Sequence, residues 1–468
     1  MRISQQSPAY IPPRPVALPP IISLLRVMLQ GDGDLLSLLP QDAYKMPVGH
    51  LGYSRRQILI VNDPQLYRNI LTDPLDIYPK NDLMVGALAP LVGDSIFVSS
   101  GEKWQQQRRM IDPAFSHMRL GQAYPSMVAA VNQYEQKLDV ASQTGEAFSL
   151  DLAMSHLTAD IICRTVFSTS IESDISREVF DAFTLFERSV AQVELKRLII
   201  DPAWSEIPQK PDVEAACQRI RQRLGELLDT HLTGAITEWN DIAAEIIKAK
   251  DSQTGEKFNR KELIDQLGVM FLAGHETTAS VLTWAFFILS SQHETVARMR
   301  AEIDAVVGKN NNDIAFEHVR QLTFTRNVFR ETLRLYPPIT FIPRVAAEAT
   351  TIGKYKVKKG AMIMISPWTI HRSEASWKNP HHFDPDRFSV EREHALVPGA
   401  YLPFGLGPRV CVGAAFATTE ATLILARLIR RFDFIALDAD KVRPVARLTT
   451  RPKQQIMCRV KWLNEKTE

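Results

Sequence analysis

The sequence predicts a mainly α fold with small β-sheets, built as one large domain around a long central helix. Nearly all of the chain from residue 121 to residue 310 has helical periodicity. Within it, about 32 residues, KELIDQLGVMFLAGHETTASVLTWAFFILSSQ, lack proline and are apolar almost all round, so this helix must be central. It would span roughly 48 Å. Strand patterns are confined to two patches, near residues 50–63 and 345–366.

Composition agrees with a globular, soluble protein. The chain of 468 residues is 45% hydrophobic and 23% charged, and its net charge of +2 gives no reason to expect nucleic-acid binding. Its four cysteines are too few for a disulfide framework, and the absence of a CxxC pair argues against structural zinc. This usage suits a reducing compartment, so we expect a soluble, cytoplasmic protein.

Residues 1–40 form a proline-rich lead-in. The apolar run IISLLRVML is interrupted by Arg26 and is far shorter than the roughly 20 residues that cross a bilayer. Prolines rather than a cleavage site precede it, which argues against a signal peptide. The run is either an amphipathic helix on a membrane surface or a first packed helix, and we favour the packed helix. No transmembrane segment is expected.

The remaining elements follow in chain order. The segment QILIVNDPQLYRNIL alternates like a strand and becomes helical at Asp63-Pro64. The helical region has polar breaks near residues 168–174, 201–212 and 250–256. TTIGKYKVKKGAMIMIS is the second strand-rich patch, and residues 371–403 form a proline-rich irregular stretch.

The loop PFGLGPRVCVG (403–413) places Cys411 just before an amphipathic helix. Free N–H groups and the helix dipole favour a thiolate there. Gly405 and Gly407 permit unusual backbone conformations, and Gly413 lets the helix start lie against a flat, bulky partner. Arg409 supplies a permanent cation. Together these features describe haem iron ligated by cysteine, with Arg409 on a propionate; a buried cysteine capping a helix would explain Cys411 alone.

This pattern, Phe404-Gly405-x-Gly407-x-Arg409-x-Cys411-x-Gly413, resembles the haem-ligand loop of the cytochrome P-450 family. The resemblance implies a single haem-thiolate domain whose long central helix lies over the haem. Haem b would be held by the Cys411 thiolate, with Phe404, Gly405, Arg409 and Gly413 around it. The resemblance covers the chain from about Asp63 to the C-terminus.

Three further residues occur in the family's order. ETLR supplies Glu331 and Arg334, three apart on one helix face, and FDPDRF supplies Arg387. Such an ExxR pair alone usually lies on a solvated surface. The resemblance implies instead a buried ion network that holds the ligand loop. Asp386 stands where the family usually has glutamate, so the acid is kept.

Other family-like positions imply further contacts to the haem propionates. WQQQRR gives Trp104 and Arg108 one helical turn apart, and IPRV gives Arg344. The alternative is an exposed tryptophan beside a basic helix. Arg109 points elsewhere on that helix, toward the surface.

The central AGHETT segment (273–278) contains residues that are unusual in a buried helix. Gly274 costs about 1 kcal/mol against alanine, and Glu276, Thr277 and Thr278 interrupt an apolar stretch. Because buried polar groups need partners, the cluster indicates a locally opened helix or a polar ligand. The alternative is a kink with the threonines bonded back to the previous turn.

The resemblance places this acid–threonine pair on the face of the haem opposite the thiolate. Thr277 would hydrogen-bond bound dioxygen or an ordered water, and Glu276 would connect that water to solvent. Burial would raise the pKa of Glu276 toward neutrality, as suits a proton relay. His275 would face packing or solvent, and Thr278 would be exposed.

The predicted substrate pocket is apolar. It comprises Phe97, Val269, Ala273, Ile339, Thr340, Phe341, Leu448 and Thr449. This lining indicates a lipophilic small molecule, of fatty-acid, terpene or steroid type. The central helix is similar to that of fatty-acid-hydroxylating members, although no arginine or lysine in these segments is an obvious carboxylate anchor.

The expected function is a monooxygenase that uses dioxygen. The chain has no GxGxxG motif, so electrons would come from a separate ferredoxin or flavodoxin-like donor with its reductase. That donor would dock on a basic surface formed by Lys103, Arg109, Arg119, Arg427 and Arg430. The alternative is that these side chains merely form solvated faces. The alternatives are a peroxide-using or rearranging haem-thiolate enzyme, disfavoured by the Glu276–Thr277 pair, and a non-catalytic haem sensor.

Overall fold

The computed structural model describes residues 10–19, 21–23, 25–26, 34–51, 56–73, 77–190, 210–233, 239–309, 311 and 313–463. Two sequence expectations fall mostly outside these ranges. One is the packing of the IISLLRVML run, of which residues 21–23 and 25–26 are described, as helical. The other is the break at 201–212, of which residues 210–212 are described.

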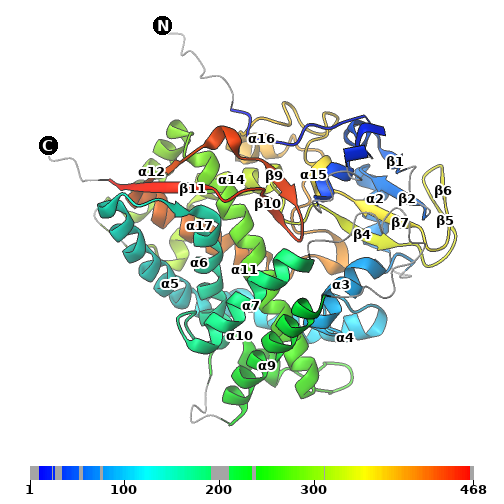
Figure 1. Cartoon of the computed structure of the whole chain (residues 1–468), viewed down its shortest axis with the longest axis horizontal. Coiled ribbons are helices and arrows are strands. Elements are labelled where there is room, and N and C mark those ends of the chain that lie inside the picture. Colours follow the sequence, from blue (N-terminus) through cyan, green and yellow to red (C-terminus); the bar gives the residue numbers. More distant parts are fainter. Residues whose placement is uncertain are drawn as a thin grey trace, which may run out of the picture.

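Helices make up most of the described chain, as predicted (Figure 1). In chain order they are α2 (Pro64–Leu71), α3 (Asp82–Val92), α4 (Gly101–Ile111), α5 (His117–Thr144), α6 (Leu150–Phe167), α7 (Asp174–Val190), α9 (Pro211–Thr233), α10 (Ile242–Lys248), α11 (Arg260–Leu289), α12 (His293–Val307), α13 (Phe316–Gln321), α14 (Thr323–Leu335), α15 (Pro367–Ile370), α16 (Val390–Glu393) and α17 (Ala414–Arg431). The break between α5 and α6 was not predicted. There Gly145 ends α5 with φ 68°, a conformation that glycine adopts without strain.

Helix α11 passes through the middle of the molecule, and most of its residues are buried. Asn259 and Glu262 form a capping box that fixes its start. The helix is continuous, so the predicted local opening is wrong. Gly274 serves packing instead: a Cβ there would overlap Cδ1 of Ile162 on α6 and lie 2.9 Å from its Cγ1. Thr277 Oγ1 donates to the carbonyl of Ala273 at 2.8 Å, which is the back-bonded alternative without a break in the helix.

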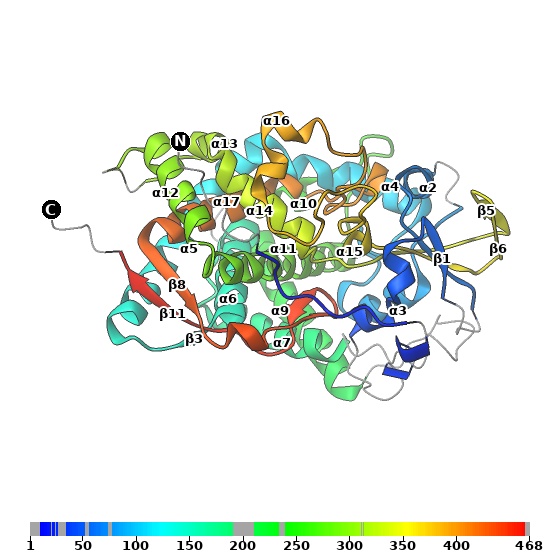
Figure 2. The ribbon, with the colours of Figure 1, turned by 90° about the horizontal axis from the view of Figure 1, so that it is seen from above.

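The two predicted strand-rich patches meet in one sheet. Its order is β1 (Val48–His50), β2 (Ile58–Val61), β7 (Met362–Ile365), β4 (Ile342–Val345). Strands β2 and β7 are parallel and the other pairs are antiparallel. Figure 2 shows β1 at the opposite end of the molecule from β8 and β11.

Three smaller sheets complete the fold. They are the hairpin of β5 (Thr350–Ile352) with β6 (Tyr355–Val357), the hairpin of β9 (Pro444–Ala446) with β10 (Thr450–Pro452), and the sheet β3 (Phe148–Ser149), β11 (Met457–Trp462), β8 (Phe432–Ala436). The last two were not predicted, because their strands are short and contribute weak alternation. One large cluster of buried apolar side chains extends from Leu36 to Val460, so both ends of the described chain share a core. Among the described helices, none is long and apolar enough to cross a membrane.

Candidate cofactor and active site

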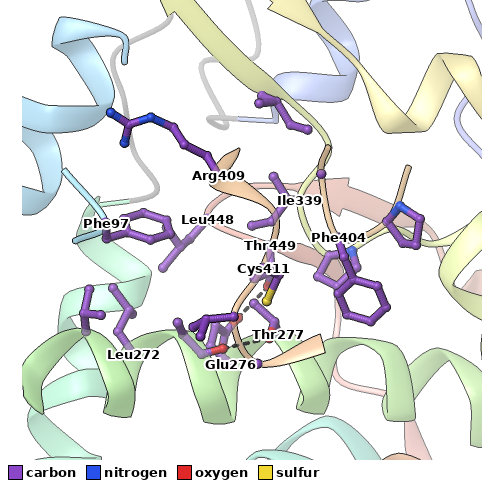
Figure 3. A pocket seen from close by; sticks show the side chains of 18 of the residues that line it. Phe97, Leu272, Glu276, Thr277, Ile339, Phe404, Arg409, Cys411, Leu448 and Thr449 are labelled. Carbon is purple, nitrogen blue, oxygen red and sulfur yellow. Dashed lines mark hydrogen bonds between the residues drawn. The ribbon is translucent and has the colours of Figure 1, made fainter. Parts of the chain in front are cut away.

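A single cavity collects every cofactor and pocket residue predicted from the sequence. It has a volume of about 480 Å³. Figure 3 shows α11 along one side, with Glu276 and Thr277 projecting from it, and with Cys411 brought in by the loop before α17. The predicted residues that line it are Phe97, Trp104, Arg108, Val269, Ala273, Glu276, Thr277, Ile339, Thr340, Phe341, Arg344, Phe404, Gly405, Arg409, Cys411, Gly413, Leu448 and Thr449.

The loop before α17 presents Cys411 to this cavity. The other three cysteines are buried in packed regions, whereas Cys411 is exposed and lines the cavity. The backbone N–H of Cys411 donates to the carbonyl of Phe404 at 2.9 Å and closes the loop. Gly405 and Gly407 both have φ 75°, and a Cβ on Gly407 would lie 2.5 Å from the carbonyl oxygen of Leu71. The glycine pattern is therefore explained by backbone conformation and by close approach to α2.

Opposing effects act on the protonation of the Cys411 thiol. Although Cys411 is exposed to the cavity, the surrounding protein desolvates its sulfur and raises its pKa, and the Gly413 N–H and the Arg108 charge only partly oppose this. The helix-terminus contribution favours the thiolate, as predicted, but it is smaller than the opposing desolvation. A metal cation at the sulfur would deprotonate it. A Cβ on Gly413 would have no neighbour within 4 Å except Cys411 Sγ, at 3.9 Å. Its absence leaves space beside the sulfur.

Cations gather on the cavity wall near the cysteine loop. The Arg409 guanidinium lies over the Trp104 ring, 4.2 Å from its centroid, and donates to the carbonyl of Ser99 at 3.0 Å. Arg108 donates to the carbonyl of Val410 at 2.7 Å, which ties α4 to the cysteine loop. The buried Arg344 also lines the cavity.

Lys80 is a further cation that sequence reasoning missed. It forms a β-bridge with Arg344, lines the cavity, and donates from Nζ to the carbonyl of Phe97. Burial holds its pKa well below the usual value, and the Arg409 and Arg344 charges lower it further. A lone lysine carries no periodic signal, so only the pairing of residues 80 and 344 reveals its position. Grouped cations around a cavity with a thiol at its base fit an anionic, flat metal group such as haem.

The predicted ion network is present and buried. Arg334 donates to Glu331 through Nε at 2.7 Å and Nη2 at 2.8 Å, and Arg387 Nε donates to the same carboxylate at 3.3 Å. Arg334 also donates to the carbonyl of His371 at 2.7 Å. His371 Nε2 in turn accepts from the N–H of Leu402 at 2.8 Å. The network thus reaches the start of the cysteine loop through His371.

Glu276 has a partner that sequence reasoning missed. Arg451, on β10, forms an ion pair with its carboxylate, with Nε at 2.8 Å from Oε1, and Thr449 Oγ1 donates to Oε1 at 2.5 Å. Desolvation raises the pKa of Glu276, but the opposing Arg451 charge and hydrogen bonds prevail and hold the pKa below its ordinary value. The predicted shift toward neutrality is therefore wrong. The i, i+175 separation of this pair leaves no sequence signal.

The residues beside Glu276 on α11 differ in burial and in whether they reach the cavity. His275 is buried among aromatic rings, with Nδ1 2.8 Å from the carbonyl of Phe271, as expected for a packing residue. Thr277 is half-buried and lines the cavity. Thr278 is 3% exposed, so its prediction as an exposed residue is wrong; it lies against the buried Glu420 of α17.

The predicted docking surface needs correction. Arg427 is buried and pairs with Glu135 at 2.7 Å, so it cannot contribute to a surface. The other four form ion pairs with acids: Lys103 with Asp94, Arg109 with Asp251, Arg119 with Glu245, and Arg430 with Asp304. Their charges are largely offset, which favours the alternative of solvated, paired faces.

A helical fold with a cysteine loop under a long central helix, and a buried ExxR network behind the loop, defines a protein of the haem-thiolate class. The sequence matches the cytochrome P450 family over residues 12–459, and the chain belongs to that family. It is an oxidoreductase of the cytochrome P450 type, since its relatives are hydroxylases and monooxygenases.

Similar proteins occur in plants, bacteria and mammals. The chain is 31% identical over 401 residues to Protein LUTEIN DEFICIENT 5, chloroplastic, of Arabidopsis thaliana, covering 82% of this chain and 66% of that protein. It is 31% identical to Cyclooctat-9-en-7-ol 5-monooxygenase of Streptomyces melanosporofaciens, covering 79% of this chain and 78% of that protein. The crystal structure of a cytochrome P450 (CYP102L1) superposes with a TM-score of 0.81 at 23% identity, over 98% of this chain and 100% of that chain. This likeness supports the fold.

Proposed function

We propose that this protein is a monooxygenase that inserts one atom of dioxygen into a lipophilic small molecule and reduces the other to water. The observation that carries the proposal is the cavity itself. It brings a cysteine thiol and the Glu276–Thr277 pair together within a lining that is otherwise largely apolar.

Haem b would be held in this cavity through Cys411, with the Cys411 sulfur as iron ligand. Bound there, haem supplies the activation of dioxygen and the transfer of one oxygen atom to the substrate. The residues that position it share contact with the cavity: Trp104, Arg108, Arg344, Phe404, Gly405, Arg409 and Gly413, together with Lys80. The cations neutralise its carboxylates, and Gly413 leaves room beside the sulfur.

Thr277 and Glu276 would manage protons on the α11 side of the cavity. The Thr277 hydroxyl donates to Ala273, so its oxygen is available to accept a hydrogen bond from a water in the cavity. Glu276 is ionised, so it would act by orienting water and accepting protons rather than by storing one. Arg451 and Thr449 hold that carboxylate in place.

The substrate would be apolar over most of its surface, because Phe97, Val269, Ile339, Phe341 and Leu448 line the cavity. Two bacterial relatives are named Cyclooctatin synthase and Cyclooctat-9-en-7-ol 5-monooxygenase, and a plant relative is named Cytokinin hydroxylase. These names concern different substrates and single out no class for this chain. Fatty acids, terpenes and steroids are therefore the compounds to screen.

Electrons would come from a separate ferredoxin or flavodoxin-like protein with its reductase, because the printed sequence lacks a dinucleotide-binding motif. We place the reaction in the cytoplasm, on the basis of the cysteine usage. The donor would meet the outside of the cysteine loop, where Val410 is exposed.

The first test is spectroscopic. Carbon monoxide added to the reduced, haem-loaded protein is expected to give the red-shifted Soret band of thiolate ligation, and Cys411→His should abolish it. A requirement for Cys163, Cys217 or Cys458 instead would contradict the assignment. A substrate that shifts the haem spectrum, with product formed under a reductase system and dioxygen, would then establish the monooxygenase.

A second candidate is a haem-thiolate enzyme that uses hydrogen peroxide. The ion pair between Glu276 and Arg451 favours it, because an ionised carboxylate is a poorer proton source for dioxygen activation than a neutral one. Product formed from peroxide alone, at a rate above that with reductase and dioxygen, would select this candidate.

A further inference from the structure

The turn between β9 and β10 places an arginine at the mouth of the cavity. Arg447 lines the cavity and is also exposed to solvent, whereas Ala446 before it and Thr449 after it are buried. Its backbone N–H donates to the carbonyl of Thr449 at 3.0 Å, which fixes the turn. A residue that borders the cavity and is also exposed to solvent marks the point where the two meet.

The Arg447 guanidinium has no ion pair or hydrogen bond among the residues that the structure describes. Asp34, which lies outside the hairpin, is an acid that contacts it. Its Oδ1 accepts from the N–H groups of Leu36 and Ala446 and is thereby engaged with backbone. An arginine without an acid at a cavity mouth can take an anion from a ligand at little desolvation cost, because it is already partly hydrated.

The other cations that line or adjoin the cavity are either assigned to haem or bonded to protein groups. Lys80, Arg344 and Arg409 lie together beside the cysteine loop, and Arg108 bonds to that loop and to Asp112. Arg451, on the strand that follows the turn, is paired with Glu276. The cations assigned to haem lie beside the cysteine loop, whereas Arg447 lies on the β9–β10 turn at the solvent-facing edge of the cavity, so it is available to a different anion.

We infer that the substrate is an amphipathic carboxylate, with its alkyl part in the cavity and its carboxylate on Arg447. This rests on the proposed function and narrows its substrate class. The planar guanidinium fork matches a carboxylate in a bidentate manner, and the half-buried Leu448 and Leu35 offer apolar contact next to it. The sequence expectation that the pocket has no carboxylate anchor overlooked Arg447, the residue directly before Leu448.

The arrangement also orients the substrate. Cys411 and Thr277 line the interior of the same cavity, while Arg447 is at its solvent-facing edge. A molecule held by its carboxylate at that edge presents carbons distant from the carboxylate to the haem. Oxidation should therefore occur at carbons of the substrate that are distant from its carboxylate.

The test compares ligands of equal length that differ in charge. Dodecanoate and dodecan-1-ol are titrated into the haem-loaded protein, and the dissociation constant is read from the shift of the Soret band. The natural protein should bind dodecanoate more tightly than the alcohol, and Arg447→Gln should weaken dodecanoate by about three- to tenfold. Binding of the alcohol should be unchanged, and added salt should weaken dodecanoate alone.

Arg443→Gln is the matched control, because Arg443 is an exposed arginine beside the same hairpin that does not line the cavity. It should leave both dissociation constants unchanged. Equal affinity for acid and alcohol in the natural protein, or an equal loss of both in Arg447→Gln, would overturn the inference while leaving the monooxygenase proposal intact. Failure of every lipophilic compound, charged or neutral, to shift the spectrum would contradict both proposals.

Discussion

At the scale of single residues, the chemistry of the site depends on partners that lie far away in the chain. Glu276 is buried, and burial alone would raise its pKa and favour the neutral form. Arg451 reverses that outcome, so the carboxylate is ionised. The protonation of Glu276 should therefore change when Arg451 is removed, and this can be tested by substitution.

Thr277→Ala should impair the use of oxygen more than the binding of substrate. The change removes a hydroxyl from the cavity wall but leaves α11, the cysteine loop and the apolar lining in place. With a competent reductase and a substrate that shifts the spectrum, reductant consumption should be comparable. Product per electron pair should fall several-fold, with hydrogen peroxide making up the difference. Unchanged coupling would assign the proton route to Glu276 and water.

Thr278→Ala is the neighbouring control. Thr278 is buried against Glu420 and also borders the cavity. Removing its hydroxyl should lower the free energy of unfolding by about 1 kcal/mol, as for one buried hydrogen bond. Coupling should be affected less than in Thr277→Ala. The two readouts, coupling and free energy of unfolding, separate the two threonines.

Arg451→Met should destabilise the protein by roughly 3–5 kcal/mol near neutral pH, because it leaves the Glu276 carboxylate buried without its counter-charge. The pKa of Glu276 should then rise, since desolvation is its largest influence. The loss should accordingly be smaller at pH 5 than at pH 8 in urea unfolding. Arg459→Met, at an exposed position on β11, is the control and should change little. An equal loss at both pH values would contradict this account.

At the scale of elements, the close contact between α6 and α11 depends on a missing side chain. Gly274 allows Ile162 to lie against the backbone of α11. In an exposed helix, alanine would be better than glycine by about 1 kcal/mol. At Gly274 we expect alanine to be destabilising instead, because overpacking a core costs about 1–3 kcal/mol.

A double-mutant cycle checks this. Gly274→Ala alone should lower the free energy of unfolding by about 1 kcal/mol. In an Ile162→Val background, which lacks the overlapping Cδ1 atom, the same change should be neutral or stabilising. Additive effects of the two substitutions would show that the contact does not set the choice of glycine.

At the scale of the whole molecule, the ion network connects α14, the irregular stretch of residues 371–403 and the cysteine loop. His371 is the link, because it accepts from Leu402 N–H and lies against the carbonyl of Arg334. Burial, together with the Arg334 and Arg372 charges, lowers the pKa of His371 to about 3. The neutral ring is therefore part of the folded structure.

Acid should consequently release the cysteine loop. The folded pKa of His371 lies below its ordinary value of 6.5, so its contribution to stability is present above pH 6.5 and is lost as the pH falls toward 3. The loss should be about 1.4 kcal/mol per pH unit, or roughly 2 kcal/mol at pH 5. His371→Gln keeps an acceptor for Leu402 but cannot titrate. Between pH 7 and pH 5, the free energy of unfolding should fall less in this variant than in the natural protein; parallel curves would assign the acid sensitivity elsewhere.

The sequence by itself determined the helical class, the central helix and the cysteine loop, because these are encoded locally by periodicity, glycine spacing and adjacent residues. The ExxR pair was readable for the same reason, since three residues on a helix fix one face. The positions of Arg387, Lys80, Arg447 and Arg451 around the site were decided by tertiary structure, although the resemblance pointed to the first. So were the burial of Thr278 and Arg427 and the ionisation of Glu276. Burial and charge pairing join residues separated by tens to hundreds of positions, and a pKa depends on whichever partner the fold brings to the carboxylate.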